Sequence, residues 1–148
     1  MKVKYENSIN YKMLERLNSI KGNVALRKDF ADLGSARQVS RGLKKLITDK
    51  KLIRLGKGIY AKARMTIYYD KPIPCGGFDV VAREALDRLN IPWESGSAEK
   101  AYNEGLSTQI PAKNIVRLKI RFRGGIQYEG SKLYFEKSAN VRRVARAN

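Results

Sequence analysis

The side chains best suited to hydrogen bonding with a partner lie in the stretch 33–46, LGSARQVSRGLKKL, where polar and cationic side chains are interspersed with apolar ones. Arginine can bind guanine through two parallel hydrogen bonds, glutamine can bind adenine in the same way, and serine can bind either base. The apolar residues recur at three- and four-residue steps, which predicts a helix with one polar face. The candidate DNA-binding side chains on this helix are Ser35, Arg37, Gln38, Ser40, Arg41, Lys44 and Lys45, with the two lysines placed for phosphates.

Two other interpretations of this helix stay open. A charged face on an amphipathic helix is usually only solvated, and a domain of this kind can also bind a protein. Three features favour DNA. Residues 35–48 hold no carboxylate, the Gly-Lys-Gly turn that follows adds Arg54 and Lys57, and residues 1–64 hold 17 basic and 5 acidic side chains. We expect Arg54 and Lys57 to contact phosphates or the minor groove.

The sequence offers no constellation for catalysis. Hydrolysis and group transfer need a positioned base, nucleophile or metal cluster. Histidine is absent, so the one cysteine, Cys75, has no imidazole to activate it. The Gly-Lys-Gly stretch is too short for a phosphate-binding loop of the Walker kind and precedes an expected strand. We therefore expect a protein that is not an enzyme and that uses neither a cofactor nor a metal.

The charge of the chain indicates a polyanionic partner. Its 148 residues include 31 Lys and Arg against 14 Asp and Glu, a net charge of +17. Two basic ends, residues 1–64 and 113–148, flank a middle of 4 basic and 7 acidic residues. No apolar run approaches the roughly 18 residues of a membrane helix, and the first residues lack the apolar core of a secretion signal. We expect a cytoplasmic protein without membrane contact.

Residues 1–64 are expected to begin with three helices. The first follows a Ser8 cap and ends near Lys21, and the second spans residues 28–33. Gly34 is expected to make a tight turn with positive φ before the third helix. That third helix is predicted to bury one apolar stripe, Ala36, Val39, Leu43, Leu46 and Ile47, and to end near residue 50.

A hairpin is expected after the third helix, with strands at residues 52–55 and 59–62. Tyr60 is expected in the core. Three helices followed by a hairpin is the order of a winged helix-turn-helix, in which the third helix lies in the major groove with its first turns against the base edges. A linker near Arg64 is expected to end this domain, which leaves residues 65–148 for a second one.

The second domain is expected to be a small α+β unit. Pro72 and Pro74 lie in an extended segment, because proline opposes a regular helix there. A helix over residues 78–90 follows, and a short helix over residues 97–105 comes after it. The first of these helices is predicted to pack through Val80, Val81, Ala85 and Leu89, with Leu86 at the margin of the packed face.

The cleanest pattern of the chain lies in residues 116–123, which alternate between apolar and cationic side chains. Such alternation predicts a strand with one buried face and a row of four cations on the other, Arg117, Lys119, Arg121 and Arg123. The row either protects a sheet edge or contacts phosphates, RNA or an acidic protein. In the second case the amino-terminal helices serve only as a scaffold. Residues 126–136 are expected to form a hairpin.

Two stretches, LRKDFADLGSARQVSRGLKKLITDKKLIRLGKGIYAKA and EKAYNEGLSTQIP, resemble the AbiEi-type antitoxins of bacterial type IV toxin–antitoxin systems, particularly their short members. The resemblance covers roughly residues 24–123. It implies a winged helix that represses its own operon by binding promoter repeats, joined to an antitoxin domain. The toxin it opposes resembles a nucleotidyltransferase and need not form a stable complex with it. The resemblance also implies base reading by Ser35, Arg37, Gln38 and Arg41, and gives Ser107, Thr108 and Gln109 either a functional or a chain-turning role.

Overall fold

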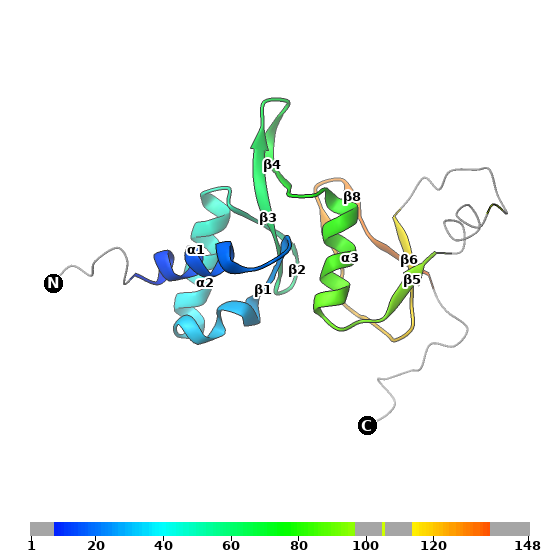
Figure 1. Ribbon diagram of the computed structural model, residues 1–148, viewed down its shortest axis with the longest axis horizontal. Helices are drawn as coiled ribbons and strands as arrows, with labels where there is room; N and C mark the ends of the chain where they lie inside the picture. Colours follow the sequence, from blue (N-terminus) through cyan, green and yellow to red (C-terminus); the bar gives the residue numbers. More distant parts are fainter. Residues whose placement is uncertain (1–7, 97–104, 106–113, 137–148) are drawn as a thin grey trace, which may run out of the picture.

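A computed structural model describes residues 8–96, 105 and 114–136 of the chain, a mixed α+β protein (Figure 1). The expected α+β class is thereby confirmed. The elements in chain order are α1 (Ile9–Ser19), β1 (Val24–Leu26), the 3-10 helix η2 (Arg27–Leu33), α2 (Ala36–Thr48), β2 (Leu52–Gly56), β3 (Ile59–Thr66), β4 (Tyr69–Pro74), α3 (Phe78–Arg88), β5 (Trp93–Ser95), β6 (Ile115–Leu118), β7 (Gln127–Tyr128), β8 (Ser131–Lys132) and β9 (Tyr134–Glu136).

The first helices begin where the sequence predicts. Ser8 Oγ accepts a hydrogen bond from the Tyr11 N–H at 3.1 Å, and Ser35 caps α2 in the same manner. The prediction for Gly34 is wrong: its φ is 175°, which is extended backbone. Glycine is needed there for space instead, because a β-carbon would lie 3.1 Å from Ile9 Cδ1 and closer still to the Gln38 side chain.

The helices α1, η2 and α2 pack around a shared core. α1 meets α2 at Gly42, where an added side chain would collide with the Met13 sulfur. Ala36 and Ile47, expected in the buried stripe of α2, are exposed. The helix turns its Val39, Gly42, Leu43 and Leu46 side inward, because only the glycine lets α1 come close. The buried members of this core from the three helices are Met13, Leu17, Phe30, Val39, Leu43 and Leu46.

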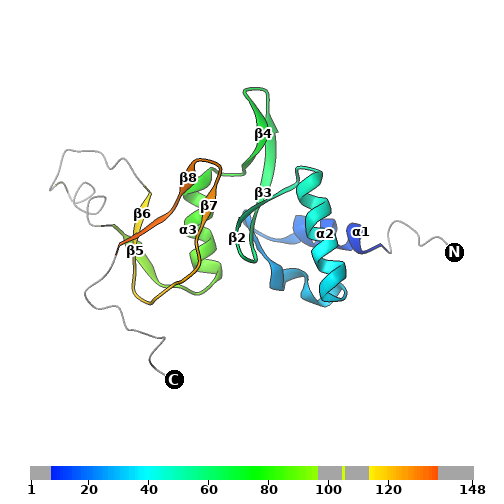
Figure 2. The same cartoon turned by 180° about the vertical axis from the view of Figure 1, so that it is seen from behind.

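The first sheet, with strand order β1-β3-β2, is buried on both faces. Its pairs are antiparallel. Tyr60 belongs to the core under α1 and α2, as predicted, while its neighbours Ile59 and Ala61 belong to a second core. Successive side chains of a strand point to opposite faces of the sheet, so β3 contributes side chains to both cores. Figure 2 shows α2 and α3 on opposite sides of these strands.

Helix α3 covers the second face of that sheet. Its buried side chains are Val81, Ala82, Ala85 and Leu86. Val80, predicted to point inward, is 52% exposed, and Leu86, predicted at the margin, is fully buried. The predictions for Val81 and Ala85 are confirmed, and those for Val80 and Leu86 are wrong, because α3 packs through a pair of adjacent residues in each turn instead of a narrow stripe.

No linker lies at residue 64. β3 runs through Arg64 to Thr66, and β4 returns beside it, so the two strands form a hairpin that projects from the rest of the molecule (Figure 1). The second core joins residues of the hairpin β2–β3 with residues of α3, β6 and the segment after it. Residues 1–64 and 65–148 therefore share a core, which corrects the expected boundary. The extended conformation predicted around Pro72 and Pro74 is confirmed as β4.

The carboxy-terminal sheet has strand order β5-β6-β9, with β6 antiparallel to β5 and parallel to β9. β6 ends at Leu118, so the strand predicted over residues 116–123 is too long. The alternation continues beyond it, however, because Ile120 and Phe122 are half-buried while Lys119, Arg121 and Arg123 are exposed. The hairpin predicted over residues 126–136 is present as the short pair β7–β8, joined by a turn at Glu129 and Gly130.

Two predictions fall outside the described residues. They are the short helix that begins at residue 97 and the role of the stretch with Ser107, Thr108 and Gln109. Within the part of the chain that the structure does describe, no helix combines the length and the apolar character needed to cross a membrane.

Two carboxylates fasten α3 to the amino-terminal elements. Glu84 Oε2 accepts hydrogen bonds from the backbone N–H groups of Asn23, at 2.9 Å, and Val24, at 2.8 Å. Asp29 binds the Arg88 guanidinium and also accepts the Leu26 N–H at 2.8 Å. These bonds satisfy backbone donors of β1 and of the residue before it that the sheet leaves unpaired, so they hold the second layer in register with the first.

We expect the change Glu84→Met to lower the free energy of unfolding by about 1–3 kcal/mol, because it leaves two half-buried N–H groups without an acceptor. Urea denaturation measures the effect. Glu15→Met is the matched control, since Glu15 is exposed on α1. If both variants unfold at the same urea concentration, Glu84 does not fasten the two layers.

Candidate nucleic-acid interface

The first turns of α2 present the predicted side chains at the surface. Arg37, Gln38, Ser40 and Arg41 are all exposed, as are the later Lys44 and Lys45. The apolar side of the helix is held against α1 and the first sheet, so the polar side can only face outward. The helix therefore displays this surface on a packed support, which suits the recognition of a rigid partner.

Ser35 and Gln38 are engaged in a capping box. Ser35 Oγ accepts from the Gln38 N–H at 3.2 Å, and Gln38 Oε1 accepts from the Ser35 N–H at 2.9 Å. A bidentate pair with adenine needs both the oxygen and the nitrogen of the glutamine amide. The bond to the Ser35 N–H takes one of the two lone pairs of this oxygen and holds the amide at the cap, so a bidentate pair with adenine competes with the capping box.

Arg27, which sequence reasoning missed, organises the start of α2. Its guanidinium donates to the Ala36 carbonyl at 2.8 Å and to Ser40 Oγ at 2.9 Å, and its backbone N–H donates to the Gly58 carbonyl at 3.0 Å. The first turn of α2 and the β2–β3 turn are thus tied to one residue. A lone arginine at the start of a helix gives no sequence signal for such a role.

Four of the predicted cations remain available to a partner. The exposed side chains of Arg37, Arg41, Lys44 and Lys57 make no hydrogen bond or ion pair with any residue that the structure describes. Of the other two, Lys45 binds Asp49 at 3.2 Å, and Arg54 donates to the Gly56 carbonyl at 3.2 Å. The available cations therefore lie on the outer face of α2 and at the β2–β3 turn, the two features that Arg27 connects.

The nearby carboxylates are neutralised. Arg16 binds both oxygens of Asp32, at 2.8 and 2.9 Å, and this hydrogen bonding lowers the pKa of Asp32 and raises that of Arg16. Asp29 is bound to Arg88. The anionic groups of η2 thus face arginines of α1 and α3, and they offset little of the positive potential of α2.

The row of cations predicted in the carboxy-terminal strand is divided. Arg117 binds Glu136 at 2.8 Å and Glu94 at 3.4 Å, and the bond to Glu136 raises the pKa of Arg117 further. Lys119, Arg121 and Arg123 follow the strand and are exposed. Arg117 therefore stabilises the sheet, while the other three are left at the surface.

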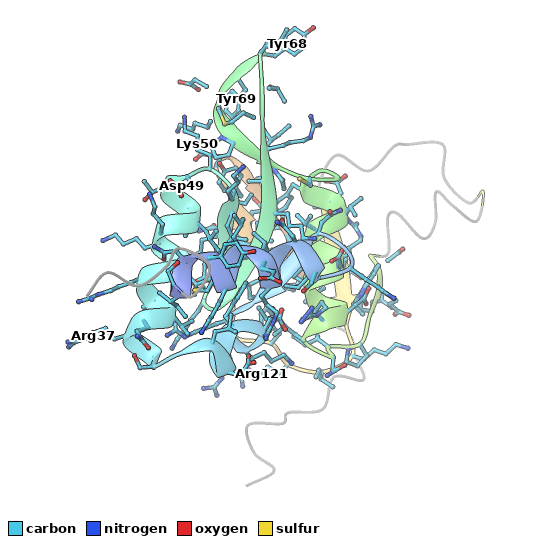
Figure 3. All side chains as sticks on the ribbon, turned by 60° about the vertical axis from the view of Figure 1, so that its left-hand side comes forward. Arg37, Asp49, Lys50, Tyr68, Tyr69 and Arg121 are labelled. Atoms are coloured by element: carbon cyan, nitrogen blue, oxygen red, sulfur yellow. The ribbon has the colours of Figure 1, made fainter. Side chains whose placement is uncertain are left out.

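The segment after β6 returns to the first sheet. A side chain at Gly56 would collide with the Gly125 carbonyl, so the backbone after Arg123 lies directly on the end of β2. Figure 3 shows Arg37 and Arg121 toward the end of the molecule opposite Tyr68. Cations from the two halves of the chain thus gather toward one end.

Nothing that the structure describes forms a metal site, since no three His, Cys, Asp or Glu side chains come together there. Cys75 is half-buried and reduced. The expectation that the protein is not an enzyme stays a prediction.

A family model described as "Family of unknown function (DUF6088)" matches residues 12–141. Searches of curated proteins and of solved structures found no match to the chain.

We expect Gln38→Met to lower the free energy of unfolding by about 1 kcal/mol, because it removes one half of the capping box while keeping the length of the side chain. Arg37→Met, the matched control one residue away, should change it by less than about 0.5 kcal/mol. Thermal and urea unfolding followed by circular dichroism measure both. Equal stability of the two variants would show that the Gln38 amide contributes nothing to the cap.

Proposed function

The chain belongs to the DUF6088 family, and because the function of that family is unknown we propose from the chain's own geometry that it binds double-stranded DNA through the exposed face of α2. The observation that carries the proposal is the pair Arg37 and Arg41, one turn apart at the start of α2, exposed and without a partner among the described residues. Arginine is the side chain most often used to read guanine in the major groove.

The arrangement around α2 supports this proposal. The order α1, β1, η2, α2, β2, β3 and the sheet order β1-β3-β2 are typical of a winged helix-turn-helix. In such a domain α2 is the recognition helix, and its first turns face the bases. The β2–β3 turn, with Lys57, would then be the wing that contacts the backbone or the minor groove.

The described side chains divide into distinct roles on DNA. Arg37 and Arg41 read base edges, and Lys44 and Lys57 bind phosphates. Ser35, Gln38 and Arg27 form and orient the start of the helix, which the capping box and the Arg27 hydrogen bonds support. Ser40 accepts a hydrogen bond from Arg27, so it helps to fix the start of the helix rather than reading a base on its own.

We propose further that the protein is a transcriptional repressor of its own operon and the antitoxin of a type IV toxin–antitoxin system. This proposal rests on the resemblance of residues 24–123 to AbiEi-type antitoxins. DNA binding by α2 is the part that geometry supports. Opposition to a nucleotidyltransferase-like toxin has the sequence resemblance alone in its favour.

A second candidate function has a separate observation in its favour. Three cations after β6 are exposed and make no ion pair within the described residues: Lys119, Arg121 and Arg123. They can bind either the phosphates of RNA or the carboxylates of an acidic protein. The engagement of Arg117 with two glutamates reduces this surface from four cations to three. We therefore rank it below the face of α2.

Fluorescence anisotropy of the protein with duplex DNA from upstream of its gene, against a scrambled duplex, tests the proposed function. We expect a preference of ~10³ or more that persists across a salt series, because base contacts are less sensitive to salt than phosphate contacts. Arg37→Ala and Arg41→Ala should each cost about 1–3 kcal/mol on the upstream duplex and little on the scrambled one.

Lys12→Ala is the control, because Lys12 is an exposed cation of α1 and not of α2 or the β2–β3 turn. Lys44→Ala should lower the affinity for both duplexes by the same factor. Equal affinity for both duplexes would contradict the proposed function. So would an Arg37→Ala variant that binds like the wild type, if a joint Arg121→Ala and Arg123→Ala change abolishes binding. Either result would favour the second candidate.

A further inference from the structure

The hairpin of β3 and β4 carries large apolar side chains away from both cores. At its tip Ile67 is 92% exposed and Tyr68 is 89% exposed. The hairpin projects clear of the helices, and Tyr68 lies at its far end (Figures 1 and 3). We call residues 65–70 the arm tip. Apolar side chains exposed together in this way are typical of an interaction site, because they gain nothing from the fold itself.

The base of the hairpin is braced against the body. Tyr128 Oη donates to the Pro72 carbonyl at 2.6 Å, and Lys71 binds Glu129 at 3.0 Å. This hydrogen bond to Glu129 raises the pKa of Lys71, and burial raises the pKa of Tyr128, so Lys71 stays charged and Tyr128 stays a donor at neutral pH. The arm tip is therefore presented from a fixed base, which lowers the entropy cost of binding something with it.

A hollow of about 380 Å³ opens beside that base. It lies between the hairpin, the start of α3 and the β7–β8 turn. Its walls include Arg64, Ile73, Phe78, Tyr128 and Ser131. Aromatic and aliphatic side chains line most of it. Of the two charged side chains in its walls, Glu129 is already bound to Lys71, whereas Arg64 is exposed, so the hollow suits an apolar side chain with a carboxylate next to it.

We propose that two copies of this chain associate by exchanging arms, with Ile67 and Tyr68 of each copy in the hollow of the other. When the tip of each copy enters the hollow of the other at the same time, the contact is two-fold and closes on itself. The charges agree with this exchange: Asp70 is the last residue of the arm tip, Arg64 lines the hollow, and neither side chain forms a hydrogen bond or ion pair with another described residue. In the pair, Asp70 of one copy meets Arg64 of the other.

Other occupants fit the arm less well. Pro72 and Pro74 have no N–H, so the outer edge of β4 cannot accept a further strand along its length. DNA is disfavoured at the tip because Tyr68 lies at the opposite end of the molecule from Arg37 (Figure 3). Self-association through the arm thus leaves the face of α2 open.

The area available matches a reversible dimer. A tyrosine buries ~150–250 Å² when it enters an interface, and each copy contributes Tyr68 together with Ile67 and the half-exposed Met65 and Tyr69. The two arms and two hollows together reach roughly the lower limit of ~1,200 Å² for a stable interface. We therefore expect a dimer that dissociates on dilution.

Sedimentation equilibrium of the full chain without DNA, over a range of concentrations, tests the arm exchange independently of the proposed function. We expect a monomer–dimer equilibrium whose dissociation constant rises at least ~30-fold in the double variant Ile67→Ser and Tyr68→Ser, the loss typical of an aromatic hot spot. Tyr134→Ser is the matched control, since Tyr134 is 43% exposed on β9 and outside the hairpin. Its dissociation constant should equal that of the wild type.

Changes in the hollow and in the charges test the reciprocal half of the contact. Ser131→Arg fills the hollow from an exposed position and should abolish the dimer. Asp70→Arg should weaken it, and adding Arg64→Asp should restore it, because both pairs in the dimer are then reversed. A monomer at every concentration, an oligomer larger than a dimer, a dimer that the tip variant leaves intact, or a charge reversal that restores nothing would each overturn the proposal.

Discussion

The fold depends on the burial of β3 in two cores at once. Tyr60 packs under α1 and α2, whereas Ile59 and Ala61 pack against α3 and the carboxy-terminal elements. The period of two in a strand forces this division, and a shift of one residue would send every side chain to the wrong core. The partners of β3 obey the same rule, since Leu52 faces the helices and Ile53 faces α3. No part of the chain that packs on β3 can be placed independently of the rest.

The same strand sets where the two candidate surfaces lie. β3 begins beside the β2–β3 turn, which Arg27 ties to the start of α2, and it ends in the hairpin with β4. Eight residues of antiparallel strand span roughly 25 Å. The cations proposed to bind DNA and the apolar tip proposed to bind a second copy are therefore kept apart by the length of one strand, and neither blocks the other.

Local chemistry made the amino-terminal elements predictable. Ser8 and Ser35 are N-cap residues that mark where α1 and α2 begin, and the spacing of Val39, Leu43 and Leu46 predicts the buried side of α2. Contacts between distant residues could not be predicted in this way. The glycine at position 42 faces inward because Met13 lies against it, and β3 continues past Arg64 because β4 pairs with it. The predicted linker there was wrong because Pro72 and Pro74, which exclude a helix, are equally compatible with an edge strand.

The candidate site was predictable by residue type but not by role. Arg37 and Arg41 lie exposed as expected, whereas Gln38 and Ser40 are bound by their own neighbours. In a sequence, an arginine that binds DNA cannot be told from one that binds the protein itself, and the same holds for serine. Only the contacts in the structure distinguish the role of Arg27 from that of Arg37. In the same way Arg117, equal to its neighbours in the pattern, is the one that binds Glu94 and Glu136.

Nitrogen-15 NMR of the arginine Nε–H groups can show whether Arg37 and Arg41 contact the bases of DNA. On titration with the upstream duplex at fixed salt, the signals of Arg37 and Arg41 should shift and sharpen as their guanidinium groups become ordered, while a scrambled duplex should leave them broad. The largest shifts at Arg121 and Arg123 with no change on α2, or the same response to both duplexes, would contradict base contact by these two arginines of α2.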